Sequence, residues 1–284
     1  MTLVINNNNK ELVFYFLIAY AFSWILWFPV LLFSNGIISG SYEVFNVLGI
    51  LASFGPFVAA TLLTLKNEGK EGLKNLYKRA FQVKLGWWWI PTLLVIPAGV
   101  ILAHLLNILF FNATFPMTEL LLNPWQIPVF FLIMLVIGGP LAEEFGWRGY
   151  AQSRLENNFN ALNSGIILGI IWSIWHIPLF LMIGQPQHDY IPFWLFMVTD
   201  VLFSIYMIWL MNNTKKSLVP AFFIHTWINV SFVMFALMEP KVGGNFMPWL
   251  LSIIVLAIIL VFVVKIYSAE NLSRQENQII DVLN

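Results

Sequence analysis

Long apolar stretches constrain this chain more than any other feature of its 284-residue sequence. About twenty apolar residues cross the roughly 30 Å hydrocarbon core of a bilayer at 1.5 Å per residue. Eight stretches approach or exceed that length, at residues 11–33, 44–65, 87–111, 125–142, 161–184, 190–211, 217–238 and 246–267. Because 60% of the residues are hydrophobic and only 10% are charged, a soluble fold could not hide this much apolar surface. The sequence predicts an all-α, polytopic transmembrane helical bundle of about eight helices, forming a single domain over residues 1–284.

The basic residues predict the orientation of this bundle. Thirteen of the fourteen lysines and arginines fall on one alternating set of chain ends and connectors, and Lys241 is the exception. Short loops rich in lysine and arginine stay in the cytoplasm. We therefore expect a multi-pass protein of the cell membrane with both termini in the cytoplasm. The heavy use of Asn, Ile and Lys hints at an AT-rich bacterial genome.

The longest connector, residues 66–86, has the pattern of a basic amphipathic helix. One side of such a helix carries Leu73, Leu76, Tyr77 and Ala80, and the other carries Lys70, Lys74, Lys78 and Arg79. A helix of this kind lies in the membrane interface with its apolar face toward lipid and its basic face toward water. We expect the first four side chains to face lipid.

Several function classes are excluded or left without support. The net charge is zero, so no global charge points to nucleic acid as a partner. The chain contains no cysteine, which excludes disulfides, thiolate metal sites and cysteine nucleophiles. Neither an HExxH metalloprotease helix nor a GxSxG serine-hydrolase turn occurs in the sequence.

Ionisable side chains within apolar spans mark function by default, since burying a charge in lipid is costly. The first group, Glu143, Glu144 and Arg148, stands at the predicted cytoplasmic end of the fourth stretch. On a helix Glu144 and Arg148 are four residues apart and can form an ion pair. Glu143 points about 100° away from Glu144, because a helical turn takes 3.6 residues. One carboxylate can therefore be held by the arginine while the other is left for chemistry.

Two further polar groups lie in the fifth and seventh stretches. Trp172 precedes His176 by one helical turn, and His225 and Asn229 share one face of their helix. Together with Glu143 these side chains could activate water in either of two ways. Glu143, His176 and His225 could bind a divalent metal with an open position, zinc being the favoured ion. Alternatively, Glu143 could act directly as a general base while His225 and Asn229 donate to an oxyanion.

These residues resemble the CAAX prenyl protease and bacteriocin-processing family of intramembrane proteases, also called the Abi family. Its pattern is EExxxR, then FxxxH, then HxxxN or HxxxD. The first motif matches Glu143, Glu144 and Arg148, and the third matches His225 and Asn229. The second matches in part, because Trp172 replaces the phenylalanine before His176, and we expect its packing role to survive. The resemblance covers residues 125–238, the core of the domain.

The resemblance implies an endopeptidase, with metalloprotease chemistry expected, whose cavity opens toward the cytoplasm. Glu143 and His176 would position or activate water, and His225 and Asn229 would stabilise the oxyanion or help to bind metal. Glu144 and Arg148 would shape the site. The implied partner is a peptide or protein substrate, lipidated or membrane-bound, within the lipid bilayer.

Two other functions compete with this hypothesis. Buried charges could instead form the ion path of a proton- or ion-coupled transporter, although the chain lacks an inverted repeat and matching broken helices. The chain could also be a non-catalytic immunity protein that binds a peptide toxin.

We expect structural roles for Asp200 in the sixth stretch and for His104 in the third. To bring His176 level with Glu143, we expect the fifth helix to begin near Leu168, with residues 148–163 forming a re-entrant or interfacial segment.

Overall fold

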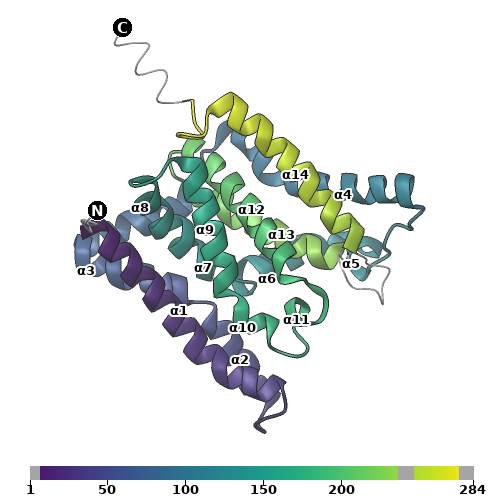
Figure 1. Ribbon diagram of the computed structural model, residues 1–284, viewed down its shortest axis with the longest axis horizontal. Coiled ribbons are helices and arrows are strands. Elements are labelled where there is room, and N and C mark those ends of the chain that lie inside the picture. Colours follow the sequence, from purple (N-terminus) through teal and green to yellow (C-terminus); the bar gives the residue numbers. More distant parts are fainter. Residues whose placement is uncertain (1–6, 236–245, 275–284) are drawn as a thin grey trace.

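A computed structural model of the protein describes residues 7–235 and 246–274, in which every regular element is helical (Figure 1). The α-helices are α1 (Asn7–Ser34), α2 (Tyr42–Ala52), α3 (Gly55–Lys78), α4 (Trp89–Phe111), α5 (Glu119–Leu122), α6 (Ile127–Ile137), α7 (Pro140–Gly146), α8 (Gln152–Glu156), α9 (Ala161–Trp175), α10 (Ile177–Phe180), α11 (Pro186–Tyr190), α12 (Phe193–Asn213), α13 (Val219–Met234) and α14 (Phe246–Tyr267). Short 3₁₀ turns occupy Arg79–Phe81 (η1), Gly86–Trp88 (η2) and Pro124–Gln126 (η3), and a π-helical turn, η4, occupies Trp147–Ala151.

The eight apolar stretches all form helices, but they differ in how they could cross a bilayer. Within the described residues α1, α4, α12 and α14 are long and apolar enough to span by themselves. The pair α2–α3 bends by 44°, and the pair α6 and α7–α8 bends by 48°, so each pair can form one broken span. Helices α9 and α13 are apolar but only 15 and 16 residues long. The predicted polytopic helical bundle is confirmed; positions 236–238 and Lys241 lie outside the described residues.

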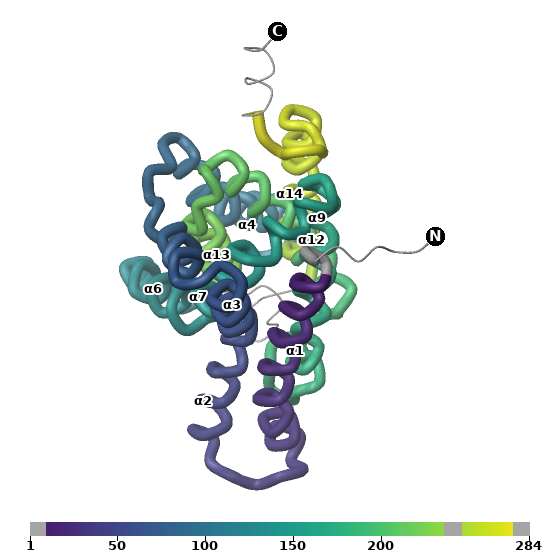
Figure 2. Tube along the Cα trace, turned by 90° about the vertical axis from the view of Figure 1, so that its left-hand side faces the viewer, coloured from purple at the N-terminus to yellow at the C-terminus, as the bar shows by residue number. Residues whose placement is uncertain are grey.

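The helices are arranged around a central group that carries the polar motifs. Helices α1, α2 and α3 pack together on one side, and α4 pairs with α14 on the other (Figures 1 and 2). Between them lie α7, α9, α12 and α13, with α9 packed along α12. The outer helices expose large apolar side chains; on α6, for example, Val129, Leu132 and Val136 are each more than half exposed. These surfaces suit contact with lipid.

Two glycines allow α9 and α12 to approach closely. A Cβ atom on Gly169 would lie 2.4 Å from Cα of Val201, and one on Gly165 would lie 3.0 Å from Cα of Ile205. Small residues four apart let helix backbones meet in a membrane, where packing rather than the hydrophobic effect drives association. This contact fixes the position of α9, which carries Trp172 and leads into His176.

A break between α6 and α7 corrects the predicted position of Glu143. Gly139 has φ of +105°, a conformation that residues with side chains rarely adopt, and Pro140 then begins α7. Helical structure continues through η4 and α8 to Glu156. Glu143 therefore lies one turn after a break inside a bent span, and the expectation that it stands at the end of the fourth helix is wrong.

The expected late start of the fifth helix is also wrong. Helix α9 begins at Ala161, where the Asn160 side chain accepts a hydrogen bond from the backbone N–H of Asn163 at 2.8 Å. It ends at Trp175, and after His176 a new short helix, α10, begins at Ile177 with Pro178 in its first turn. Residues 147–156 form η4 and α8, in a bent helix pair whose shape fits either a broken span or a re-entrant segment, so the predicted re-entrant or interfacial character of 148–163 stays a prediction.

The connector after the second stretch packs against protein rather than lipid. Helix α3 runs on to Lys78 with a kink at Gly69, whose φ is +69°. Leu76 is buried in the apolar core, and the ring of Tyr77 contacts that of Phe145. The expectation that Leu76 and Tyr77 face lipid is therefore wrong. The helical and basic character of the segment was predicted correctly.

Basic residues from distant connectors meet at one end of the bundle. Arg154 in α8 pairs with Glu68 in α3 at 2.6 Å and lies 3.8 Å from Glu11 in α1. Lys216, between α12 and α13, pairs with Glu156 of α8 at 2.5 Å. The backbone at the start of α9 also donates to carbonyl groups just after α14. The start of α1 and the end of α14 thus contact the same end of the central group.

We expect Gly169→Ala to destabilise the protein, because the added methyl group would force α9 away from the backbone of α12. A loss of about 1–3 kcal/mol in the free energy of unfolding is typical of such overpacking. Thermal unfolding in detergent, followed by tryptophan fluorescence, measures the effect. Gly99→Ala is the matched control, since its Cβ would meet only Val255 at an ordinary 3.9 Å. Equal melting temperatures of the two variants would contradict the close approach.

Candidate active site

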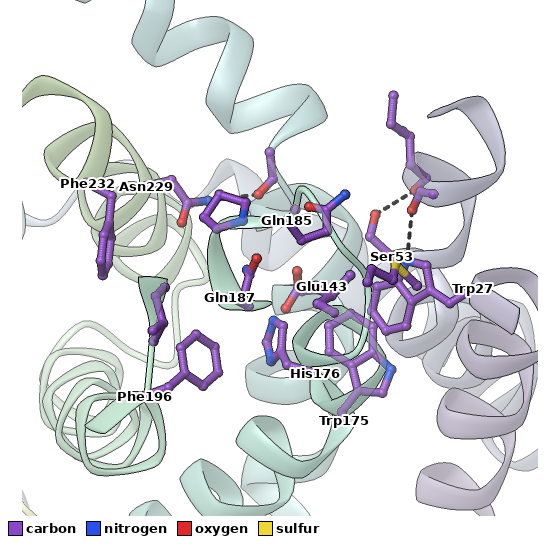
Figure 3. A pocket seen from close by; sticks show the side chains of 18 of the residues that line it. Trp27, Ser53, Glu143, Trp175, His176, Gln185, Gln187, Phe196, Asn229 and Phe232 are labelled. Carbon is purple, nitrogen blue, oxygen red and sulfur yellow. Dashed lines mark hydrogen bonds between the residues drawn. The ribbon is translucent and has the colours of Figure 1, made fainter. Parts of the chain in front are cut away.

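A cavity of about 620 Å³ lies between the α1–α2 side of the bundle and the central helices. Glu143, His176, His225 and Asn229 all line it, and they come from α7, the end of α9, and α13. Figure 3 shows Glu143 and His176 facing the same space, with Gln187 beside them and Trp27 and Ser53 on the α1–α3 side. The structure therefore brings together the polar groups that the sequence placed on three separate helices.

Glu143 is almost fully buried, with 4% of its surface exposed. Its Oε2 accepts a hydrogen bond from the indole N–H of Trp172 at 2.7 Å. Its Oε1 lies beside Gly139, where a Cβ atom would come within 2.4 Å of this oxygen. A side chain at position 139 would take the space next to Oε1, so the glycine leaves that oxygen open toward the cavity.

Glu144 and Arg148 form a buried ion pair behind the cavity wall. Both side chains are fully buried, and Nη1 of Arg148 lies 3.2 Å from Oε2 of Glu144. Arg148 also donates to the Ser204 hydroxyl at 3.1 Å, and its guanidinium lies 4.3 Å from the ring centroid of Trp172. This confirms the predicted helical pairing and shows that Arg148 belongs to the protein interior rather than to a basic loop.

His225 is oriented by this ion pair. Its Nδ1 lies 2.7 Å from Oε1 of Glu144. A carboxylate only accepts, so Nδ1 carries the proton and donates to it. The second ring nitrogen, Nε2, remains for a ligand. A histidine backed by a carboxylate has a fixed ring orientation and tautomer, which suits a catalytic or ligating role.

His176 caps the C-terminus of α9 and is oriented by its own helix. Its Nδ1 lies 2.9 Å from the backbone carbonyl oxygen of Trp172, which can only accept, so Nδ1 donates there. Nε2 is then an acceptor in the neutral ring. The nearest carboxylate oxygen to Nδ1 is Oδ2 of Asp200, at 4.0 Å. Rings of Trp175 and Phe196 enclose the imidazole.

Asn229 joins α13 to the break before α7. Its side-chain amide donates to the carbonyl oxygen of Gly138 at 2.8 Å. One N–H of the amide group is used in this way and the other remains for a ligand. The bond holds the Gly138–Gly139 corner from which Glu143 projects.

The predicted zinc ligands Glu143, His176 and His225 line one cavity. Among the residues that the structure describes, no three His, Asp or Glu side chains are grouped so that they could hold one ion. Oε2 of Glu143 and Nδ1 of both histidines bind protein partners, which leaves Nε2 of each ring for a ligand. Zinc binding by Glu143, His176 and His225 therefore stays a prediction.

Sequence reasoning missed three contributions to the site. Trp172 was expected to pack, but its indole N–H also binds Glu143. Ser204 was not singled out, although a small polar residue one helical turn after Asp200 marks a buried polar face. Asp200, expected to be structural, lines the cavity with a buried Oδ2 that has no hydrogen-bond partner in the described residues. His104 lies outside the cavity, packed against Phe115 and Phe235.

We expect Arg148→Ala to unfold the protein more easily, because Glu144 would be left buried without its counter-charge. Breaking a buried pair in this way typically costs about 3–5 kcal/mol. The free energy of unfolding in detergent should recover in part in the double variant Glu144→Gln/Arg148→Met, which buries no charge at either position. A double variant as unstable as Arg148→Ala would show that the lost charge pairing is not the cause.

Two comparisons with known proteins bear on this site. Residues 124–231 match the family described as "Type II CAAX prenyl endopeptidase Rce1-like". This range contains all six candidate residues. The chain is also 30% identical to the CAAX prenyl protease 2 of Methanococcus maripaludis over 241 residues, which is 79% of this chain and 85% of that protein. The resemblance predicted from the three motifs is thus confirmed. The chain belongs to the Rce1-like family of type II CAAX prenyl endopeptidases, and it is a multi-pass membrane endopeptidase.

Proposed function

We propose that this endopeptidase cleaves a peptide bond near a lipidated end of a membrane-bound protein, using water activated by Glu143. The observation that carries the proposal is the common cavity, which Glu143, His176 and His225 line from three different parts of the bundle. Such a constellation has the parts that amide hydrolysis requires, namely a base and donors for the oxyanion.

Glu143 serves as the base in this mechanism. Its free Oε1 takes a proton from water while the water oxygen bonds to the carbonyl carbon of the scissile bond. The tetrahedral intermediate then breaks its C–N bond, and the proton held by Glu143 passes to the leaving nitrogen. The products are a carboxylic acid and an amine, so atoms and charge balance. Nε2 of His176, as an acceptor, helps to orient the same water.

His225 and Asn229 face the oxygen that becomes negative. In its doubly protonated form His225 donates through Nε2, while Nδ1 stays bound to Glu144. The second amide N–H of Asn229 supplies another donor. Glu144 and Arg148 do not touch the reacting atoms. Glu144 instead binds Nδ1 of His225 and fixes the orientation of its ring. The buried ion pair therefore serves catalysis as well as stability.

Support for a lipidated substrate comes from the other part of the cavity. Trp27, Val30, Phe33 and Phe45 of α1 and α2 line it, and a long apolar group bound there would lie next to the polar end. The relative's name, CAAX prenyl protease 2, points in the same direction. A farnesylated C-terminal peptide is therefore the first substrate to test.

We also propose that the basic end of the bundle faces the cytoplasm, with both chain ends on that side. The contacts of Arg154 and Lys216 with α1, α3 and α8 gather basic residues there, and positive charge is retained on the cytoplasmic side. Because the chain lacks cysteine, single cysteines introduced at Lys70 and at Ser39 can be labelled from either side of sealed vesicles to check this orientation.

We expect Glu143→Gln to lower the rate of peptide cleavage at least about 100-fold, the effect of losing a general base. Glutamine keeps the size and polarity of the side chain but cannot take a proton. Cleavage of a farnesylated peptide is measured in liposomes, and melting temperature is measured in parallel. Glu119→Gln, at an exposed glutamate outside the cavity, is the control. Full activity of Glu143→Gln would contradict the proposed mechanism. If the wild-type protein cleaved no member of a peptide library, the result would favour a non-catalytic immunity protein.

We expect cleavage to persist after treatment with a zinc chelator, because the proposed base acts without a metal. The metal content of the purified protein, measured by mass spectrometry, should fall well below one ion per chain. Stoichiometric zinc, together with loss of activity on chelation and recovery on adding zinc, would instead support the metal site predicted from Glu143, His176 and His225.

A further inference from the structure

We infer that Trp172 is a positioning residue for Glu143: its indole N–H holds one carboxylate oxygen so that the other faces the reacting water. This inference rests on the proposed role of Glu143 as the base. It assigns to the tryptophan a hydrogen-bonding role beyond the packing role expected for an aromatic residue before His176.

The hydrogen bond distinguishes the two oxygens of Glu143. Oε2 accepts from Nε1 of Trp172 at 2.7 Å, and both side chains are buried. Oε1 lies on the side of Gly139, where the missing Cβ leaves space. A carboxylate without this donor could rotate about its terminal bond, because such torsions have broad and roughly two-fold preferences. The indole therefore selects one orientation, with Oε1 toward the cavity.

The indole can do this because it is itself held on several sides. Its ring lies 5.2 Å from the ring of His225 in an edge contact, and the guanidinium of Arg148 lies 4.3 Å from its centroid. Only 3% of Trp172 is exposed. Its backbone carbonyl accepts the hydrogen bond that orients His176. One residue thus contacts the base and both histidines, and the close approach of Gly169 to α12 fixes the helix that carries it.

Trp175 provides a comparison on the same helix. It is equally buried, with 1% exposed, and its ring centroid lies 4.7 Å from that of His176. Its indole nitrogen has no hydrogen-bond partner among the described residues. The two tryptophans therefore share burial, helix and contact with His176, but differ in whether the N–H group binds a carboxylate.

The test replaces the indole of Trp172 with benzothiophene, by incorporating 3-benzothienylalanine into the full-length protein. Sulfur then stands in place of N–H, so ring size and shape are kept and only the donor is lost. We expect kcat for a farnesylated peptide to fall about 10- to 100-fold with KM nearly unchanged, as for the loss of a hydrogen bond to a charged group. Trp172→Phe, which keeps an aromatic ring without a donor, should show the same split between kcat and KM.

The same isostere at Trp175 measures the effect of the ring exchange by itself, and the loss of kcat at position 172 should exceed it. Equal losses at the two positions, or a rise in KM with kcat kept, would overturn the inference.

Glu143→Gln in the same assay separates the two hypotheses. If that variant is inactive while the Trp172 isostere keeps wild-type kcat, the inference fails and the proposed function stands. If Glu143→Gln is itself active, the proposed function fails as well.

Discussion

The buried contact between Glu144 and Arg148 is the interaction on which the polar interior depends. Two full charges without solvent exposure are tolerated when each compensates the other and hydrogen bonds satisfy some of their remaining polar atoms, although Nε of Arg148 has no hydrogen-bond partner among the described residues. Arg148 therefore also binds Ser204 on α12, and Glu144 also binds His225 on α13. The ion pair, formed by neighbouring residues of α7 and η4, thus links this segment to α12 and α13 next to the cavity.

Breaks in the helices place the chemistry inside the bundle. The corner at Gly138–Gly139 lets Glu143 emerge from the middle of a bent span, and the early end of α9 leaves His176 at a helix terminus facing the same space. Non-helical backbone at membrane depth is stable only where protein or a water-filled cavity satisfies its polar groups. Asn229 meets that requirement at the corner by binding the carbonyl of Gly138. The irregular backbone and the polar motifs therefore occur together for a physical reason.

Sequence reasoning captured the features that depend on local rules. Apolar length predicted the helices, and the spacing of Glu144 and Arg148 predicted their pairing, because both depend on residues close in the chain. It missed the depth of Glu143 and the start of α9, which depend on where a helix breaks inside an apolar run. Hydropathy cannot show such a break, although Gly-Gly-Pro at 138–140 and Pro178 were visible signals. The hydrogen bond from Trp172 to Glu143 joins residues that are 29 positions apart in the chain. Neither sequence motif predicts it, because it depends on how two helices pack.

The close approach of α9 to α12 divides the wall of the cavity into a rigid half and an adaptable half. Gly165 and Gly169 bring backbone against backbone, so α9 cannot slide or turn without a collision. This contact therefore holds the helix that carries Trp172 and leads into His176. The facing wall, formed by α1, α2 and the α10–α11 segment, contacts the cavity through side chains such as Phe33, Phe45 and Ile183. Substitutions there can reshape the cavity while the contact between α9 and α12 is kept, so the shape of the bound segment and the position of α9 can change independently.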